Sequence, residues 1–143
     1  MNKQICVVGG GRWGKNHIAT LNKLNCLGGL VEKNQDLIKV YSQKYSNIKI
    51  FDNIDNAIEF GFDGFVIATP AETHYNIGKK IIESGNHVLI EKPITTNVED
   101  AKKLKDLSMS CNVNLMVGHL LLFHPAINKI KELINQNKIG DLQ

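Results

Sequence analysis

The glycines near the start of the chain have the spacing of a phosphate-binding loop. Gly9, Gly11 and Gly14 occupy the glycine positions of the pattern G-x-G-x-x-G, with Arg12 and Trp13 between the last two. In this pattern the first glycine permits a tight turn, the second lets the backbone approach a pyrophosphate, and the third allows close helix–strand packing. Because a helix N-terminus attracts phosphate through its unpaired N–H groups and its dipole, this loop predicts a dinucleotide site.

An acidic residue supports the same interpretation. Glu32 ends the second apolar run, about twenty residues beyond the loop, where a carboxylate binds the adenosine ribose hydroxyls. A carboxylate there repels a 2′-phosphate, so the predicted cofactor is NAD, with NADP less favoured, although Lys33 follows directly and softens that preference. The alternative is a surface Glu-Lys pair after a strand, with the glycine loop serving only as a turn.

Two further polar segments follow apolar runs. The segment 69–74 comes after the fourth run, and Glu91-Lys92-Pro93 comes after the fifth. Open α/β sheets bind ligands outside the carboxyl ends of their strands, so both segments are expected at the cofactor cleft. The residues predicted to line it are Thr69, Pro70, His74, Glu91 and Lys92. The alternatives are a structural or solvent-facing His74, and a solvated Glu91–Lys92 ion pair ahead of a proline turn.

Lys92 has the placement of a catalytic base. A lysine at the edge of the sheet can meet both the nicotinamide end of a cofactor and a substrate hydroxyl. Desolvation beside a positively charged nicotinamide favours the neutral amine that a general base requires. We therefore predict that Lys92 is catalytic.

Short apolar runs alternate with stretches of helical periodicity along the chain. The runs are nearly continuous, as is typical of parallel strands covered on both faces. The predicted strands are 5–8, 27–31, 48–51, 65–68, 88–90 and 113–117. The predicted helices are 13–25, 35–45, 54–60, 74–84, 97–110 and 125–137. Repeated βα units with right-handed crossovers predict an α/β fold with a doubly wound parallel sheet.

Capping residues support these boundaries. Gly85 is placed to end the fourth helix. Thr73 is a candidate cap for that helix, and Thr96 with Glu99 predicts a capping box at the start of the fifth. Pro125 fits the first turn of the sixth helix, where its missing N–H costs nothing.

Composition excludes several classes of function. The net charge of +3 comes from scattered lysines, with Arg12 the only arginine, so we expect no nucleic-acid partner. The three cysteines lack metal-ligand spacing, and Cys6 is expected to be a buried free thiol. Residues 1–8 are too short for a signal peptide, and no apolar run is long enough to cross a bilayer. We therefore expect a cytoplasmic protein with no membrane partner and no metal.

These motifs together resemble the Gfo/Idh/MocA oxidoreductases, a family named after glucose–fructose oxidoreductase and inositol 2-dehydrogenase. The matching segments are Val7-Val8-Gly9-Gly10-Gly11-Arg12-Trp13-Gly14-Lys15-Asn16, Ala68-Thr69-Pro70 with Thr73-His74, and Gly85-Asn86-His87-Val88 leading to Glu91-Lys92-Pro93. The tripeptide Glu91-Lys92-Pro93 is the family's most specific mark. The match runs essentially from end to end of this chain.

The resemblance implies an NAD(P)-dependent dehydrogenase or isomerising oxidoreductase acting on sugars, polyols or related compounds. In this family the lysine matching Lys92 contacts nicotinamide and substrate and assists proton transfer. The stretch containing His119 and His124 is most similar to members that handle nucleotide sugars. Both histidines are candidate substrate residues, with helix-edge packing the alternative that we favour for His124. Many relatives have arginine where this chain has Leu122, which removes one expected substrate contact.

The resemblance also implies a second, α+β domain that carries much of the substrate pocket. We expect residues 1–120 to form the dinucleotide-binding Rossmann domain, and 121–143 to form a helix and the start of a connection to that second domain, which is absent here. Three functions are consistent with these features: an enzyme, an NAD-binding module without independent catalysis, and a regulatory remnant with a degraded site. The presence of Glu32, Glu91 and Lys92 argues against the degraded remnant. A surface left bare by the absent domain is expected to be apolar and to drive self-association.

Overall fold

The fold is built on one parallel β-sheet. The computed structural model describes residues 3–140, and within them six strands lie in the order β3-β2-β1-β4-β5-β6. Each neighbouring pair is parallel, as predicted. The strands are β1 (Ile5–Val8), β2 (Leu27–Val31), β3 (Lys49–Phe51), β4 (Gly64–Ile67), β5 (His87–Ile90) and β6 (Leu115–Val117).

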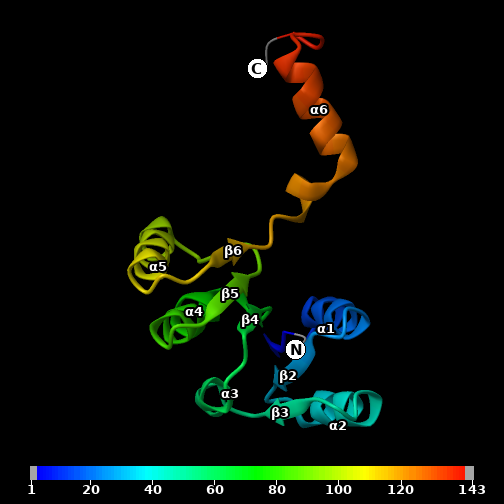
Figure 1. Cartoon of the computed structure of the whole chain (residues 1–143), viewed down its shortest axis with the longest axis vertical. Coiled ribbons are helices and arrows are strands. Elements are labelled where there is room, and N and C mark those ends of the chain that lie inside the picture. Colours follow the sequence, from blue (N-terminus) through cyan, green and yellow to red (C-terminus); the bar gives the residue numbers. More distant parts are fainter. Residues whose placement is uncertain (1–2, 141–143) are drawn as a thin grey trace.

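Helices cover both faces of the sheet, which confirms the predicted doubly wound α/β fold. In Figure 1 α1 and α2 lie on one side of the strands, whereas α3, α4 and α5 lie on the other. The helices are α1 (Gly14–Lys23), α2 (Gln35–Lys44), α3 (Ile54–Phe60), α4 (His74–Glu83), α5 (Val98–Ser110) and α6 (Pro125–Asn135). Two short 3-10 turns that the sequence did not predict, η1 (Ala71–Thr73) and η2 (Leu120–Phe123), follow β4 and β6.

The last helix stands apart from the sheet. Figure 1 shows α6 projecting away from the six strands, with η2 at its base. Pro125 occupies the first turn of α6, as predicted, and the side chains of Leu121, Leu122 and Phe123 are exposed. These exposed apolar side chains follow β6, and the self-association expected of such a surface stays a prediction.

The strand order reverses direction between β1 and β4. From β1 the chain passes outward through β2 to β3, and it then returns to place β4 on the other side of β1. At such a switch point the loops after the two central strands diverge and leave a crevice at the carboxyl edge of the sheet. The loops that diverge here begin at Gly9 and Ala68.

The core lies on both faces of the central strands. Successive residues of a strand point to opposite faces, so Cys6 and Val8 pack with Ile67 on one side, while Val7 packs with Ile18 on the other. The predicted burial of Cys6 is confirmed, and this burial raises the pKa of its thiol well above the ordinary value.

Two of the predicted caps are wrong. Thr73 has helical dihedrals and no capping bond, because its hydroxyl donates to the carbonyl of Pro70 instead. The cap of α5 is Asn97 rather than Thr96, since the Asn97 side chain accepts from the N–H of Asp100 at 2.8 Å. The predicted glycine at the end of α4 is confirmed, because Gly85 adopts a positive φ of 79° immediately after the C-cap residue Ser84.

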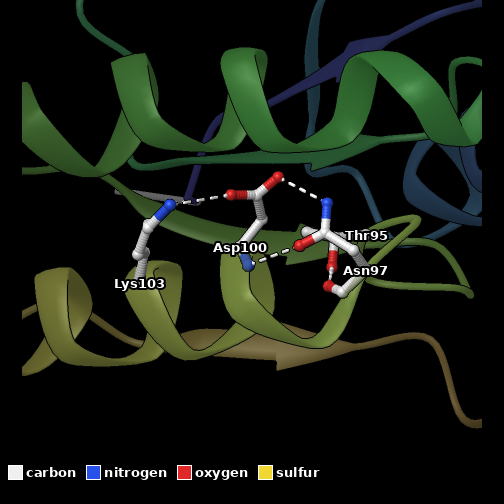
Figure 2. A network of polar contacts seen from close by, with 4 residues as sticks. All are labelled: Thr95, Asn97, Asp100 and Lys103. Carbon is white, nitrogen blue, oxygen red and sulfur yellow. Dashed lines mark hydrogen bonds and ion pairs between the residues drawn. The ribbon is translucent and has the colours of Figure 1, made fainter.

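Figure 2 shows the polar network that begins α5. The hydroxyl of Thr95 donates to the carbonyl of Asn97 at 2.6 Å, and the Asn97 amide donates to the Asp100 carboxylate at 2.7 Å. Bonds from Asn97 and Lys103 hold the pKa of Asp100 below its ordinary value. Because Thr95 is buried, the network anchors the loop that connects Glu91-Lys92-Pro93 to α5.

Leu104 connects α5 to the rest of the core, and its removal is a direct test of this packing. The side chain is fully buried against α4, where a methyl group added to Gly78 would lie 3.6 Å from it. Replacing Leu104 by alanine should lower the free energy of unfolding by about 2–5 kcal/mol. Met109→Ala, at an exposed position on the same helix, should change it by less than about 0.5 kcal/mol. Equal losses in urea denaturation would contradict the packing.

Candidate functional site

The glycine loop runs from the end of β1 to the start of α1. Gly9 has a φ of 92°, and a side chain at Gly14 would collide with the carbonyl oxygen of Gly9. These two glycines therefore allow α1 to begin directly against β1. A Cβ at Gly11 would meet nothing within 4 Å, so the backbone there faces open space. No side chain caps α1, which leaves the helix N-terminus available to an anion.

Glu32 connects this loop to the end of β2. Its Oε2 accepts from the N–H of Gly10 at 2.7 Å, and its Oε1 accepts from the N–H groups of Lys33 and Asn34 at 2.8 and 2.9 Å. A carboxylate offers about four acceptor positions, so roughly one remains for a ribose hydroxyl. These bonds also contradict the alternative of a simple surface Glu-Lys pair, because Glu32 binds three backbone amides.

A cavity of about 760 Å³ opens beside Glu32. It lies at the carboxyl ends of β1, β2 and β4 and reaches the start of α3. Its lining includes Val8, Gly9, Val31, Glu32, Lys33, Asp52, Asn53, Ile54, Asp55, Asn56, Thr69, Pro70, Thr73, Ile77 and Lys80. The sequence interpretation missed the segment 52–56, although it follows β3 at the same edge of the sheet and could have been found from that position.

His74 lies beneath the loops rather than at the surface of the cleft. Its side chain is buried, with Nδ1 2.8 Å from the carbonyl oxygen of Pro93 and Nε2 2.8 Å from that of Thr69. The ring therefore connects the loop after β4 to the loop after β5. This arrangement favours the structural interpretation of His74, and its contact with a cofactor stays a prediction.

Glu91 is paired with a histidine that the sequence interpretation missed. The Nε2 atom of His17, in the first turns of α1, lies 2.7 Å from Oε1 of Glu91, and both side chains are largely buried. The other oxygen of Glu91 accepts from the N–H of Lys92 at 3.2 Å. The alternative interpretation, a solvated ion pair between Glu91 and Lys92, is therefore wrong. Glu91 instead joins the end of β5 to the helix that follows the glycine loop.

A second cavity, of about 460 Å³, lies at the carboxyl ends of β5 and β6. Residues of the glycine loop, the loop after β5 and η2 meet there. The lining is Trp13, Glu91, Lys92, Gly118, His119, Leu120, Leu121 and Leu122. The structure thus brings Lys92 close to the predicted substrate residue His119 and to Trp13. The Lys92–Pro93 peptide bond is cis.

Other predicted residues lie outside these contacts. Arg12 is exposed on the glycine loop. His124 is exposed at the start of α6, where its Nδ1 accepts from the N–H of Ala126 at 3.2 Å. It therefore caps the helix without the packing that the sequence favoured, and its contact with a substrate stays a prediction. Within residues 3–140 no group of three or more His, Cys, Asp or Glu side chains is placed to hold a metal ion. None of the helices described there combines the length and apolarity of a membrane span.

The strand order, the switch point and the glycine loop define a dinucleotide-binding Rossmann fold. Residues 3–119 match the model of the oxidoreductase family with an NAD-binding Rossmann fold, GFO_IDH_MocA. The chain belongs to this family. The resemblance inferred from Glu91-Lys92-Pro93 and the glycine loop is therefore confirmed.

Two of the curated relatives are named as dehydrogenases of sugar compounds. UDP-N-acetylglucosamine 3-dehydrogenase of Acidithiobacillus ferrooxidans is 28% identical over 88% of this chain and 40% of its own length. Glucose-6-phosphate 3-dehydrogenase of Bacillus subtilis is 26% identical over 98% of this chain and 40% of its own length. The chain therefore spans about 40% of the length of these curated relatives.

A solved structure shares the fold. The WlbA dehydrogenase from Bordetella pertussis, in complex with NADH and UDP-GlcNAcA, superposes with a TM-score of 0.90 and 24% identity. The match covers 98% of this chain and 44% of the WlbA chain.

The surroundings of Gly14 and Gly11 predict different effects of the same substitution. Gly14→Ala should lower the free energy of unfolding by about 1–3 kcal/mol, because the new methyl group displaces α1 from the Gly9 carbonyl. Gly11→Ala, with open space around the new methyl group, should leave it within about 0.5 kcal/mol. Chemical denaturation measures both, and equal stability of the two variants would refute the close helix–strand contact.

Proposed function

We propose that this domain binds NAD in preference to NADP as the cofactor half of a dehydrogenase for sugars, polyols or nucleotide sugars. The observation that carries the proposal is the open backbone at Gly11 in a loop that reaches two cavities at the carboxyl edge of the sheet, one lined by Gly9 and the other by Trp13. The larger cavity, with Glu32, suits the adenosine half. The smaller one, with Lys92, suits the nicotinamide and the substrate.

The preference for NAD rests on the electrostatics of Glu32. Its carboxylate is held in place by three backbone N–H groups, so it does not readily turn away from a ligand. A 2′-phosphate beside it would place two like charges close together, which disfavours binding. Lys33 lines the same cavity and partly offsets this repulsion.

Lys92 is the proposed catalytic residue. When bound, the nicotinamide of NAD supplies an acceptor for a hydride from a carbinol carbon. The amine of Lys92 then removes the proton of the reacting hydroxyl, in a cavity that this residue lines together with three leucines. Glu91 is held by His17 and fixes the backbone of Lys92 from beneath.

A second candidate function is an NAD-binding module that does not turn over alone. It is favoured by the exposed apolar side chains of η2, next to Lys92, which a further domain or a second copy would cover. In this case the substrate pocket is completed by other parts of the enzyme. Self-association through η2 is expected where no further domain covers these side chains.

Titration with NADH tests the proposal. Trp13, the only tryptophan, lines the cavity assigned to nicotinamide, so NADH should quench its fluorescence and raise the melting temperature. NADPH should bind at least about tenfold more weakly because of Glu32. Gly11→Ala, matched in stability to the wild type, should weaken NADH binding by about tenfold or more. Absence of quenching and stabilisation by NADH would contradict the proposal.

Lys92→Met separates catalysis from binding. The substitution keeps the side-chain length but removes the amine, so turnover of NAD with sugars, polyols or nucleotide sugars should fall roughly 100-fold or more. NADH affinity should change less than about twofold, and Lys129→Met on the exposed face of α6 should change neither. Full turnover by the Lys92→Met variant would refute the catalytic role of Lys92. If the wild-type protein binds NADH but turns over no substrate, the binding-module function is favoured instead.

A further inference from the structure

The backbone of Gly10 is held at both of its polar groups. Its N–H donates to Glu32 at 2.7 Å, and its carbonyl accepts from the hydroxyl of Tyr41 at 2.6 Å. Glu32 follows β2 and Tyr41 lies on α2, so two separate elements hold one residue of the glycine loop. Both Gly10 and Tyr41 are buried.

The ring of Tyr41 also explains why residue 10 is a glycine. A Cβ on Gly10 would lie 2.6 Å from Cε2 of Tyr41 and 3.2 Å from Oε2 of Glu32. The phosphate-binding pattern itself allows any residue at this position. Gly10 does not have the positive φ of Gly9, so contact with the ring, rather than backbone conformation, excludes a side chain.

We propose that Tyr41 is a positioning residue that aims the Gly11 N–H at the cofactor pyrophosphate, an inference that rests on the proposed NAD binding. The carbonyl of Gly10 and the N–H of Gly11 belong to one planar trans peptide, in which they point in opposite directions. A hydroxyl that holds the carbonyl on the α2 side therefore turns the N–H away from Tyr41. The donor is set before the ligand arrives.

Tyr41 has the surroundings that this role requires. It packs in the core formed by Val7 and Leu30 and stacks on Tyr45, with ring centroids 6.2 Å apart. Burial, Tyr45 and the nearby charge of Glu32 raise the pKa of Tyr41 above its ordinary value, so the hydroxyl, which is protonated at neutral pH in any case, remains a donor at higher pH as well. Three consecutive glycines would otherwise lose much conformational freedom on binding, so a preset loop lowers that cost.

Removal of one hydroxyl tests the inference. Tyr41→Phe keeps the ring but leaves the Gly10 carbonyl without its donor, so the Kd for NADH should rise roughly three- to tenfold. Tyr45→Phe, at the residue that follows α2 and stacks on Tyr41, is the matched control, and its Kd should stay within about twofold of the wild type. The Kd for adenosine, which lacks the pyrophosphate, should be nearly the same in all three proteins. A general loss of structure would weaken both ligands together.

A double-mutant cycle tests the steric part. Gly10→Ala should weaken NADH binding strongly in the presence of Tyr41, because the new methyl group meets the ring. In the Tyr41→Leu background, where the outer ring atoms are gone, the same substitution should cost at least about threefold less in Kd.

The outcomes separate this inference from the proposed function. Wild-type protein that fails to bind NADH would overturn both. Wild-type binding together with unchanged affinity in Tyr41→Phe would overturn the role of Tyr41 and leave the proposed function standing. If Gly10→Ala raised the Kd for NADH equally in the Tyr41 and Tyr41→Leu backgrounds, the role of Tyr41 would also be overturned. The role is supported if Tyr41→Phe weakens the binding of NADH but not of adenosine, and if Tyr41→Leu reduces the cost of Gly10→Ala.

Discussion

The contact between Gly14 and the carbonyl of Gly9 determines the rest of the site. Because neither residue carries a side chain, the start of α1 packs closely against the loop that leaves β1, at the edge where the loops after β1 and β4 diverge. Any other residue at position 14 would displace the helix from this position. The positive end of the helix, the open backbone at Gly11 and the placement of Trp13 and His17 all follow from this one approach.

Several polar contacts then fix the loops around this helix start. Glu32 and Tyr41 hold the glycine loop from the β2 side, whereas His17 joins α1 to Glu91 at the end of β5. His74 ties the loop after β4 to Pro93. The loops at the carboxyl edge are thus held together by hydrogen bonds between elements distant in sequence. These bonds fix the positions of the two cavities relative to each other. Such preorganisation lowers the entropic cost of binding an extended, flexible dinucleotide.

Most of the fold could be predicted from the sequence because strong local patterns specify it. The six strands and six helices lie where apolar runs and helical periodicity placed them, with ends within about two residues. The cap of α5 was predicted wrongly because Thr96 and Glu99 have the spacing of a capping box, although asparagine is the stronger N-cap residue. The buried Thr95, whose hydroxyl donates to the Asn97 carbonyl, is a further contact that the capping pattern does not contain. The His17–Glu91 pair spans 74 residues and has no local signal. Tyr41 is indistinguishable from other apolar-face residues of a helix until its contact with Gly10 is seen.

We propose that one dinucleotide occupies both cavities and passes over the Gly11 backbone from one to the other. Amide chemical shifts in a 15N-labelled sample titrated with NADH test it most directly. We predict that Gly11, residues of the Glu32 cavity such as Asn53, and residues of the Lys92 cavity such as His119 shift together with a single Kd. Shifts confined to one cavity, or an unperturbed Gly11, would contradict this claim.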